Sequence, residues 1–98
     1  MKKELENSLK TKAAQDLYQA LAKLNNPKEI SDFLRDVLTL EEIEEASRRF
    51  LVAKLLKSGK SIRETKRETG VAIATIVRIN YWLHHGMGGY DLALEKLK

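Results

Sequence analysis

The sequence predicts an all-α fold of about six helices, and two features of its residue pattern indicate this. Apolar residues recur every three or four positions along most of the chain, which places them on one face of a helix. Pro27 and the five glycines stand where these periodic segments end, and no useful stretch alternates with the period of a strand. The chain has 98 residues, the length of one domain, so we expect residues 1–98 to form a single domain.

The first two helices are expected over residues 3–24 and after Pro27. Leucines and alanines at helical spacing make residues 3–24 one long amphipathic segment. Asn26 is placed to cap the second helix, with Pro27 at its first position and Glu29 placed for a capping-box return. The second helix then carries a single apolar stripe of four residues: Ile30, Phe33, Leu34 and Val37.

A third helix is expected over residues 40–58, from a capping box of Thr39 and Glu42 to a stop at Gly59. Its apolar residues cover more than one face, so it must be surrounded. The first helix would be about 33 Å long at 1.5 Å per residue, which is too long to wrap so small a core alone. These features favour a homodimer that exchanges helices over the alternative, a monomeric bundle.

Residues 61–84 have the form of a helix-turn-helix. Ser61 and Glu64 make a capping box at the start of a short helix, and a second helix follows over residues 73–84. The turn between them contains Gly70, which adopts a positive φ without a Cβ clash. Two threonines and a lysine stand at positions that are usually apolar or small in this motif, so the pattern alone leaves an ordinary helical hairpin open: Thr65, Thr69 and Lys66.

The positive charge of the chain is concentrated in its middle. Residues 1–46 carry seven Lys/Arg and ten Asp/Glu, a net charge of −3. Residues 47–83 carry nine Lys/Arg and two Asp/Glu, a net charge of +7. Residues 84–98 have a net charge of zero, so the whole chain carries +4. Such segregation predicts that one part of the fold faces a polyanion. Charge alone leaves open the alternative of a solvated, lysine-rich helical surface.

The second helix of the motif begins in a way that suits an anion. Its cap position is Ala72, so no Ser, Asp or Asn side chain covers the free N–H groups, and the helix dipole favours a phosphate there. Small side chains let the backbone approach the floor of the major groove. Four cations flank this end, as phosphate contact and base reading require: Arg63, Lys66, Arg67 and Arg78. The alternative is that Ala74 and Thr75 only pack and that the arginines are solvated.

Several other chemistries find no support in the sequence. The chain has no cysteine, which excludes disulfides and thiolate metal sites. His84 and His85 point about 100° apart on a helix and have no carboxylate one turn away, so we expect no metal site. Residues 85–89 follow no strand and are expected to be a turn before a last helix over residues 90–97, not a phosphate loop. No apolar run could form a signal peptide or cross a membrane, which predicts a cytoplasmic protein without a membrane partner.

Three segments resemble the tryptophan repressor family: residues 38–42, residues 48–49, and residues 70–78, which contain the sequence IATI. The stretch from about 31 to 97, roughly two-thirds of the chain, is most similar to the shorter YerC/YecD branch of that superfamily. Members of that branch carry a glycine-containing turn before an aromatic residue and a last helix, as residues 82–90 do here. The resemblance implies six helices, an intertwined dimer of the Trp-repressor type, and sequence-specific operator binding.

Carried over to this chain, the resemblance implies that Arg63 reads a base and Lys66 contacts a phosphate. Ile73, Ala74 and Thr75 would form the reading edge of the recognition helix, and a tyrosine replaces an asparagine on its DNA side. Together with the charge argument, this predicts a set of nine DNA-binding residues: Arg63, Lys66, Arg67, Ala72, Ile73, Ala74, Thr75, Arg78 and Tyr81.

The resemblance also marks a corepressor-pocket-like set. Two arginines sandwich the indole in tryptophan-responsive members, and Arg49 and Arg78 stand at those positions, while two residues match the loop that holds the amino group: Leu38 and Thr39. Ile79 and Trp82 replace a glycine and a serine there. Either Trp82 fills the place of the indole in cis, or it packs in the dimer core and the pocket is lost. In both cases we expect no cofactor and no response to tryptophan.

The sequence therefore predicts a transcriptional regulator, a repressor, that binds double-stranded DNA as a homodimer and reads the major groove with helix 73–84. The alternative is a protein-interaction module that docks an acidic partner through the basic helices. We expect no enzyme and no catalytic residue, because no acid–base or nucleophile pair stands out. Chorismate mutases, which are small intertwined helical dimers, place an arginine on the first helix, and residues 1–24 contain none.

Overall fold

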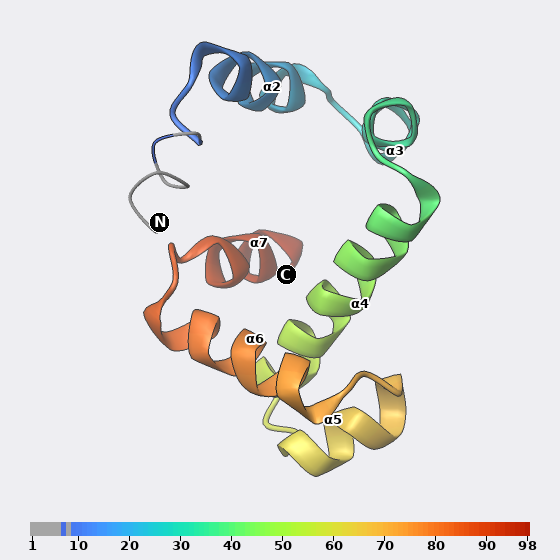
Figure 1. Ribbon diagram of the computed structural model, residues 1–98, viewed down its shortest axis with the longest axis vertical. Coiled ribbons are helices and arrows are strands. Elements are labelled where there is room, and N and C mark those ends of the chain that lie inside the picture. Colours follow the sequence, from blue (N-terminus) through green and yellow to red (C-terminus); the bar gives the residue numbers. More distant parts are fainter. Residues whose placement is uncertain (1–6, 8) are drawn as a thin grey trace. The chain divides into compact units, whose positions relative to one another are not determined.

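The structure is a computed structural model that describes residue 7 and residues 9–98. These residues form six helices and no strand, which confirms the predicted all-α fold. The chain divides into two compact units, Met1–Thr39 and Leu40–Lys98, and each is described by itself. The division does not test the expected single domain, which stays a prediction. The helices carry the labels of Figure 1: α2 (Lys12–Lys23), α3 (Pro27–Val37), α4 (Leu40–Lys57), α5 (Ile62–Thr69), α6 (Ile73–His85) and α7 (Gly89–Leu97).

Helix α2 starts later than the sequence predicts because Thr11 caps it. The Thr11 hydroxyl accepts a hydrogen bond from the N–H of Ala14 at 3.2 Å, and residues 9 and 10 form a turn ahead of it. A threonine that satisfies a free N–H in this way begins a helix. The prediction of one continuous helix over residues 3–24 is therefore wrong at this turn, and residues 3–6 and 8 lie outside the described residues. Helix α2 has 12 residues, about 18 Å, so its length no longer argues for exchange between subunits.

Helix α3 begins at the predicted cap, with one difference. The side-chain oxygen of Asn26 accepts a hydrogen bond from the N–H of Glu29 at 3.0 Å, and Pro27 occupies the first turn. The Glu29 carboxylate accepts from the N–H of Asn25 at 2.8 Å, one residue further out than a capping box requires. The two bonds fix the connection between α2 and α3.

Neither α2 nor α3 contains a buried residue. Each helix gathers most of its apolar side chains on one face, where they are half-buried, whereas Tyr18 and Val37 are exposed. An amphipathic helix normally buries such a face against another surface. Between them, the described helices of the first unit, α2 and α3, bury no side chain completely and form no closed core. We name this set the N-terminal apolar face: Leu17, Leu21, Leu24, Ile30, Phe33 and Leu34.

The second unit has a closed core between α4 and α6. Helix α4 contacts each of the other three helices of this unit, and α5 also contacts α6 (Figure 1). The core consists of two residues of α4 and three of α6: Val52, Ala53, Ile76, Ile79 and Leu83. Four half-buried residues pack against it: Leu56, Ile62, Val71 and Tyr90. One chain therefore holds the helix-turn-helix in place by itself.

The ends of these helices lie within one or two residues of the predicted ones. Helix α4 ends at Lys57 before Gly59, and α6 ends one residue beyond the prediction, at His85. A Cβ atom on Gly86 would lie 2.5 Å from the carbonyl oxygen of Trp82, so only glycine fits there. An ion pair of 2.9 Å between Lys57 and Asp91 joins α4 to α7. None of the described helices is both long and apolar enough to cross a membrane.

Candidate nucleic-acid interface

Helix α5 is fixed at its start by the predicted capping box. The Ser61 hydroxyl accepts a hydrogen bond from the N–H of Glu64 at 3.0 Å, and the Glu64 carboxylate accepts one from the N–H of Ser61 at 3.0 Å. The bond from the Ser61 backbone, and then the bond with its side chain, lower the pKa of the Glu64 carboxyl below its ordinary value of 4.5. The nearby charges of Lys60 and Arg67 shift this pKa in the same direction. The carboxylate therefore holds the helix end in its ionised form.

Three basic side chains of α5 are exposed: Arg63, Lys66 and Arg67. Within residue 7 and residues 9–98, none of the three forms an ion pair, whereas nearby Lys60 pairs with Glu68 at 3.3 Å. A cation without a carboxylate partner remains available to a phosphate or a base edge. The arrangement leaves α5 with positive charge directed to solvent.

The turn after α5 has the conformation that the sequence predicts. Gly70 has φ +72°, and its N–H donates to the carbonyl of Lys66 at 2.8 Å. Residues with a Cβ atom rarely adopt a φ in this range, whereas glycine does so without strain. Helix α6 then begins three residues after Gly70, at Ile73. The short turn therefore couples the direction of α6 closely to the end of α5.

Helix α6 begins without a side-chain cap. Ala72 at the cap position makes no side-chain hydrogen bond, and no acidic residue stands in the first turn. Ile73 and Ala74 in that turn are exposed, and Thr75 is half-buried. The positive end of the helix is thus open to an anion, as predicted from the residue types.

An exposed apolar stripe runs along α6. Ile73 is 49% exposed, Val77 47% and Tyr81 57%, and their spacing of four residues places them on one face. The sequence predicts Ile73 and Tyr81 as contact residues and misses Val77, although the spacing between those two could have identified it. Arg78 is also exposed, and its guanidinium donates to the Thr75 hydroxyl at 3.4 Å.

The opposite face of α6 belongs to the core. Ile76, Ile79 and Leu83 repeat at helical spacing and are buried with Val52 and Ala53 of α4. Packing against α4 therefore decides which side chains of α6 face solvent. The exposed face of α6 is held rigidly by the buried one.

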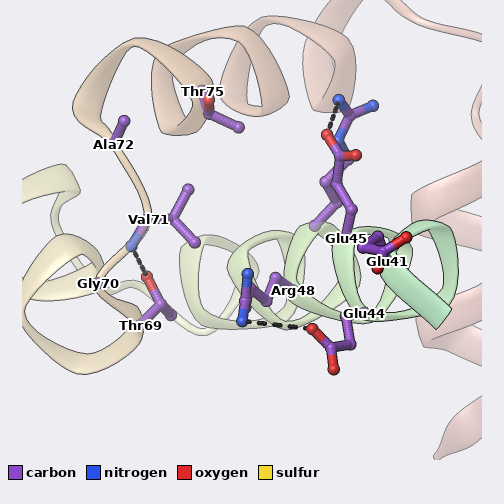
Figure 2. A pocket seen from close by; sticks show the side chains of 10 residues that line it. Glu41, Glu44, Glu45, Arg48, Thr69, Gly70, Val71, Ala72 and Thr75 are labelled. Atoms are coloured by element: carbon purple, nitrogen blue, oxygen red, sulfur yellow. Dashed lines mark hydrogen bonds and ion pairs between the residues drawn. The ribbon is translucent and has the colours of Figure 1, made fainter.

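A pocket of about 660 Å³ lies between α4 and the turn before α6 (Figure 2). Its α4 wall includes two arginines, each engaged by a glutamate one turn earlier. Arg49 lies 2.8 Å from Glu45, and Arg48 lies 3.8 Å from Glu44. The other wall is formed by residues 69–72 and by Thr75. Figure 2 shows both ion pairs beside the pocket.

The structure does not gather the predicted corepressor-pocket-like residues at this pocket. Of that set, only Arg49 lines it, and Arg78, Ile79 and Trp82 do not. Ile79 is fully buried in the core because it shares the helical phase of Ile76 and Leu83, and Trp82 is 39% exposed. The interpretation of Ile79 and Trp82, either as filling the place of the indole or as packing in the dimer core, stays a prediction.

The other two residues of that set, Leu38 and Thr39, belong to the first unit. Leu38 ends α3, where its N–H donates to the carbonyl of Leu34 at 2.8 Å. Its own carbonyl accepts a bond from Arg35 at 3.4 Å.

An all-α unit with a short turn between two helices, exposed cations and an open helix end defines the class of helix-turn-helix proteins. The Trp repressor protein family matches residues 12–98 of this chain. The chain is 30% identical over 92 residues to the YerC protein of Bacillus subtilis (strain 168). The aligned residues cover 94% of this chain and 88% of YerC.

Two solved structures are also similar. One is a TrpR-like protein from Eubacterium eligens ATCC 27750, with 42% identity and a TM-score of 0.86 over 93% of this chain and 94% of that chain. The other is a Trp-repressor-type protein from Staphylococcus aureus, with 32% identity and a TM-score of 0.86 over 93% of this chain and 91% of that chain.

The chain therefore belongs to the Trp repressor family, in its YerC group. At the level of the family, this makes it a DNA-binding regulator of transcription. The family is regulatory and not enzymatic.

Proposed function

We propose that this protein is a cytoplasmic repressor that binds a specific sequence of double-stranded DNA as a homodimer. In this proposal, residues 73–84 of α6 read the major groove and α5 contacts the phosphate backbone beside it. The observation that carries the proposal is the combination of an uncapped, solvent-facing start of α6 with three exposed cations on α5 that form no ion pair with any described residue. A duplex offers both the phosphates and the groove that such a combination fits.

In this proposal, some side chains contact base edges and others contact phosphates. Arg63 reads a base edge, for which guanine is the preferred partner of an arginine. Lys66 and Arg67 contact phosphates, and the small side chains of Ala72 and Ala74 let the backbone come close to the DNA. The apolar stripe of α6 suits the methyl groups that thymines present in the major groove. Three further residues complete the surface: Thr75, Arg78 and Tyr81.

A gel-shift titration with the pure protein and random duplex tests this function. Binding should weaken steeply as salt rises, because each phosphate contact releases counterions. Selection from a random pool should then yield one preferred sequence. Failure to bind duplex at low salt would contradict the proposal and favour the protein-interaction alternative, in which the basic helices dock an acidic partner. Run-off transcription from a template that carries the selected site should fall when the protein is added.

The homodimer is supported by apolar side chains that are only half-buried or are exposed in the described part of one chain. They include the N-terminal apolar face and, in the second unit, three side chains with large exposed areas: Leu51, Leu92 and Leu97. The chain has a mass of 11.2 kDa, so the dimer should sediment at about twice that value and its unfolding midpoint should rise with concentration. The two half-sites on DNA should lie about 34 Å apart, one helical turn. A stable monomer at micromolar concentration would contradict the dimer.

We also propose that the protein acts without tryptophan or any other cofactor. An indole sandwich needs two free arginines at one pocket. Here the Arg49 guanidinium is engaged by Glu45, and Arg78 does not line the pocket. Calorimetry should show no heat with L-tryptophan, and tryptophan should leave the gel shift unchanged. Micromolar binding that strengthens DNA affinity would contradict this proposal and leave DNA binding itself untouched.

A further inference from the structure

Two threonines of α5 occupy positions that are usually apolar in a helix-turn-helix, and both use their hydroxyl groups along the helix. The Thr65 hydroxyl donates to the carbonyl of Ser61 at 2.8 Å, and the Thr69 hydroxyl donates to the carbonyl of Thr65 at 2.8 Å. Thr65 is fully buried, and this bond explains how the interior accepts its oxygen. Both hydroxyls therefore donate one hydrogen bond to the carbonyl four residues earlier in the chain.

Thr69 differs from Thr65 in a second bond. Its hydroxyl oxygen also accepts a hydrogen bond from the N–H of Val71 at 3.1 Å (Figure 2). A hydroxyl has one donor and two acceptor positions, so one oxygen can serve both partners. The group thereby links the last turn of α5 to the residue that follows Gly70.

Val71 is the residue through which the turn joins the core. Its side chain packs against the buried cluster of α4 and α6, and α6 begins two residues later. Gly70 between them is conformationally permissive and does not restrict the turn by itself. The N–H of Gly70 donates to the carbonyl of Lys66 and the N–H of Val71 donates to the hydroxyl of Thr69, so the first two of the three turn amides are bound to α5.

We propose that Thr69 is a positioning residue of the helix-turn-helix, whose hydroxyl bridge to Val71 sets the angle at which α6 leaves α5. This inference rests on the proposed DNA-binding function, because that angle matters when α5 and α6 must meet one duplex together. Thr69 contacts no DNA in this role. It acts through Val71 on the direction of the reading helix.

Three variants separate the hydroxyl bridge from packing. Thr69→Val keeps the shape and removes the hydroxyl, and Thr69→Ser keeps the hydroxyl and removes the methyl. Thr65→Val is the matched control, because its hydroxyl also bonds a carbonyl one turn back but no turn amide. The Ser61 carbonyl still accepts the N–H of Thr65 at 2.9 Å, so Thr65→Val leaves no group unpaired.

Two measurements test the inference. The first is affinity for the duplex that the wild-type protein selects, relative to random duplex. We expect a loss of about tenfold in this ratio for Thr69→Val, the size expected for one lost hydrogen bond, and no change for Thr69→Ser or Thr65→Val. The second is hydrogen exchange of the Val71 amide, which should be protected in the wild-type protein and exchange about tenfold faster in Thr69→Val alone.

Each outcome of these measurements either supports or overturns the positioning role of Thr69. Unchanged selectivity in Thr69→Val, or an equal loss in Thr69→Ser, would overturn the positioning role. A freely exchanging Val71 amide in the wild-type protein would overturn it even if Thr69→Val failed to fold. If the wild-type protein binds no duplex, the proposed function fails, while faster Val71 exchange in Thr69→Val still supports the bridge as the device that fixes the turn.

Discussion

The two units of this chain differ in how they use their apolar residues. In the second unit, Val52 and Ala53 of α4 and Ile76 and Ile79 of α6 are completely inaccessible to solvent. In the first unit, α2 and α3 are as clearly amphipathic, yet neither has a buried residue. Both units have capped helices, so the difference lies in packing and not in local helix signals.

Because their packing differs, the two units are stabilised in different ways. Short isolated helices are marginal in water and depend on burial of an apolar face. The second unit buries that face within one chain, so its helix-turn-helix is preformed. The first unit presents the N-terminal apolar face, which in our proposal is covered when two chains associate. Substitutions in the two units should therefore affect different measurements.

The largest effect is expected in the core of the second unit. Ile76→Ala should lower the free energy of unfolding by about 2–5 kcal/mol, because it removes a fully buried side chain and leaves a cavity. Urea unfolding followed by circular dichroism measures this loss. Val77→Ala, at the next and exposed position, should change the free energy by about 0.5 kcal/mol or less. Equal effects of the two variants would mean that the second unit has no closed core.

A smaller effect of another kind is expected from the N-terminal apolar face. Phe33→Ala should weaken the dimer by about 1.5–3 kcal/mol, because it removes two Phe33 side chains, one from each chain, that are each already half-buried before association. That loss raises the dissociation constant by roughly tenfold to a hundredfold, which sedimentation equilibrium can measure. Lys28→Ala is the control, since it removes only an exposed ion pair with Asp32 on the same helix. A Phe33→Ala protein that dimerises like the wild type would show that this face is not the interface.

Two substitutions of exposed residues on α5 test the DNA contacts of the second unit and leave its core unchanged. Arg63→Ala should cost about 1–3 kcal/mol in DNA binding and relax the preference at one base position. Lys66→Ala should weaken all sequences alike and lower the salt slope by about one. Gel shifts with the selected duplex and its single-base variants, over a salt series, measure both. Identical behaviour of the two variants would contradict the division between base and phosphate contacts.

The smallest effect is expected at the capping box of α5. Ser61→Ala should lower the free energy of unfolding by about 0.5–2 kcal/mol, because the cap of a helix is lost. The Glu64 carboxyl contributes through its ionised form. Since its pKa is lowered in the folded state, its contribution is complete above 4.5 and is lost as the pH falls through the folded pKa.

Glu64→Gln isolates that acid-dependent part. The amide keeps an acceptor for the Ser61 N–H but does not titrate, so stability should fall less steeply in this variant than in the wild type between about pH 6 and pH 3. Urea midpoints over that range measure the slope. Parallel curves for the two proteins would show that the cap bonds do not favour the ionised carboxylate.

Most helix ends could be predicted from the sequence because caps act within a few residues. Ser61 with Glu64, Asn26 before Pro27, and Gly70 at a positive φ all lie where their residue types indicate. The same locality identified the exposed cations of α5 and the uncapped start of α6. The one clear failure, the helix over residues 3–24, was also local: Thr11 can stand inside a helix or cap one, and periodicity does not distinguish the two.

Tertiary packing decided what periodicity left open, namely which side of each helix is covered. The sequence alone determined an all-α chain with a basic middle and a helix-turn-helix pattern. Only contact with α4 decided that Ile79 lies in the core and that Val77 faces solvent. The physical reason is that side-chain spacing fixes the relative phase of residues on one helix, whereas the absolute direction of that helix depends on the neighbour it packs against.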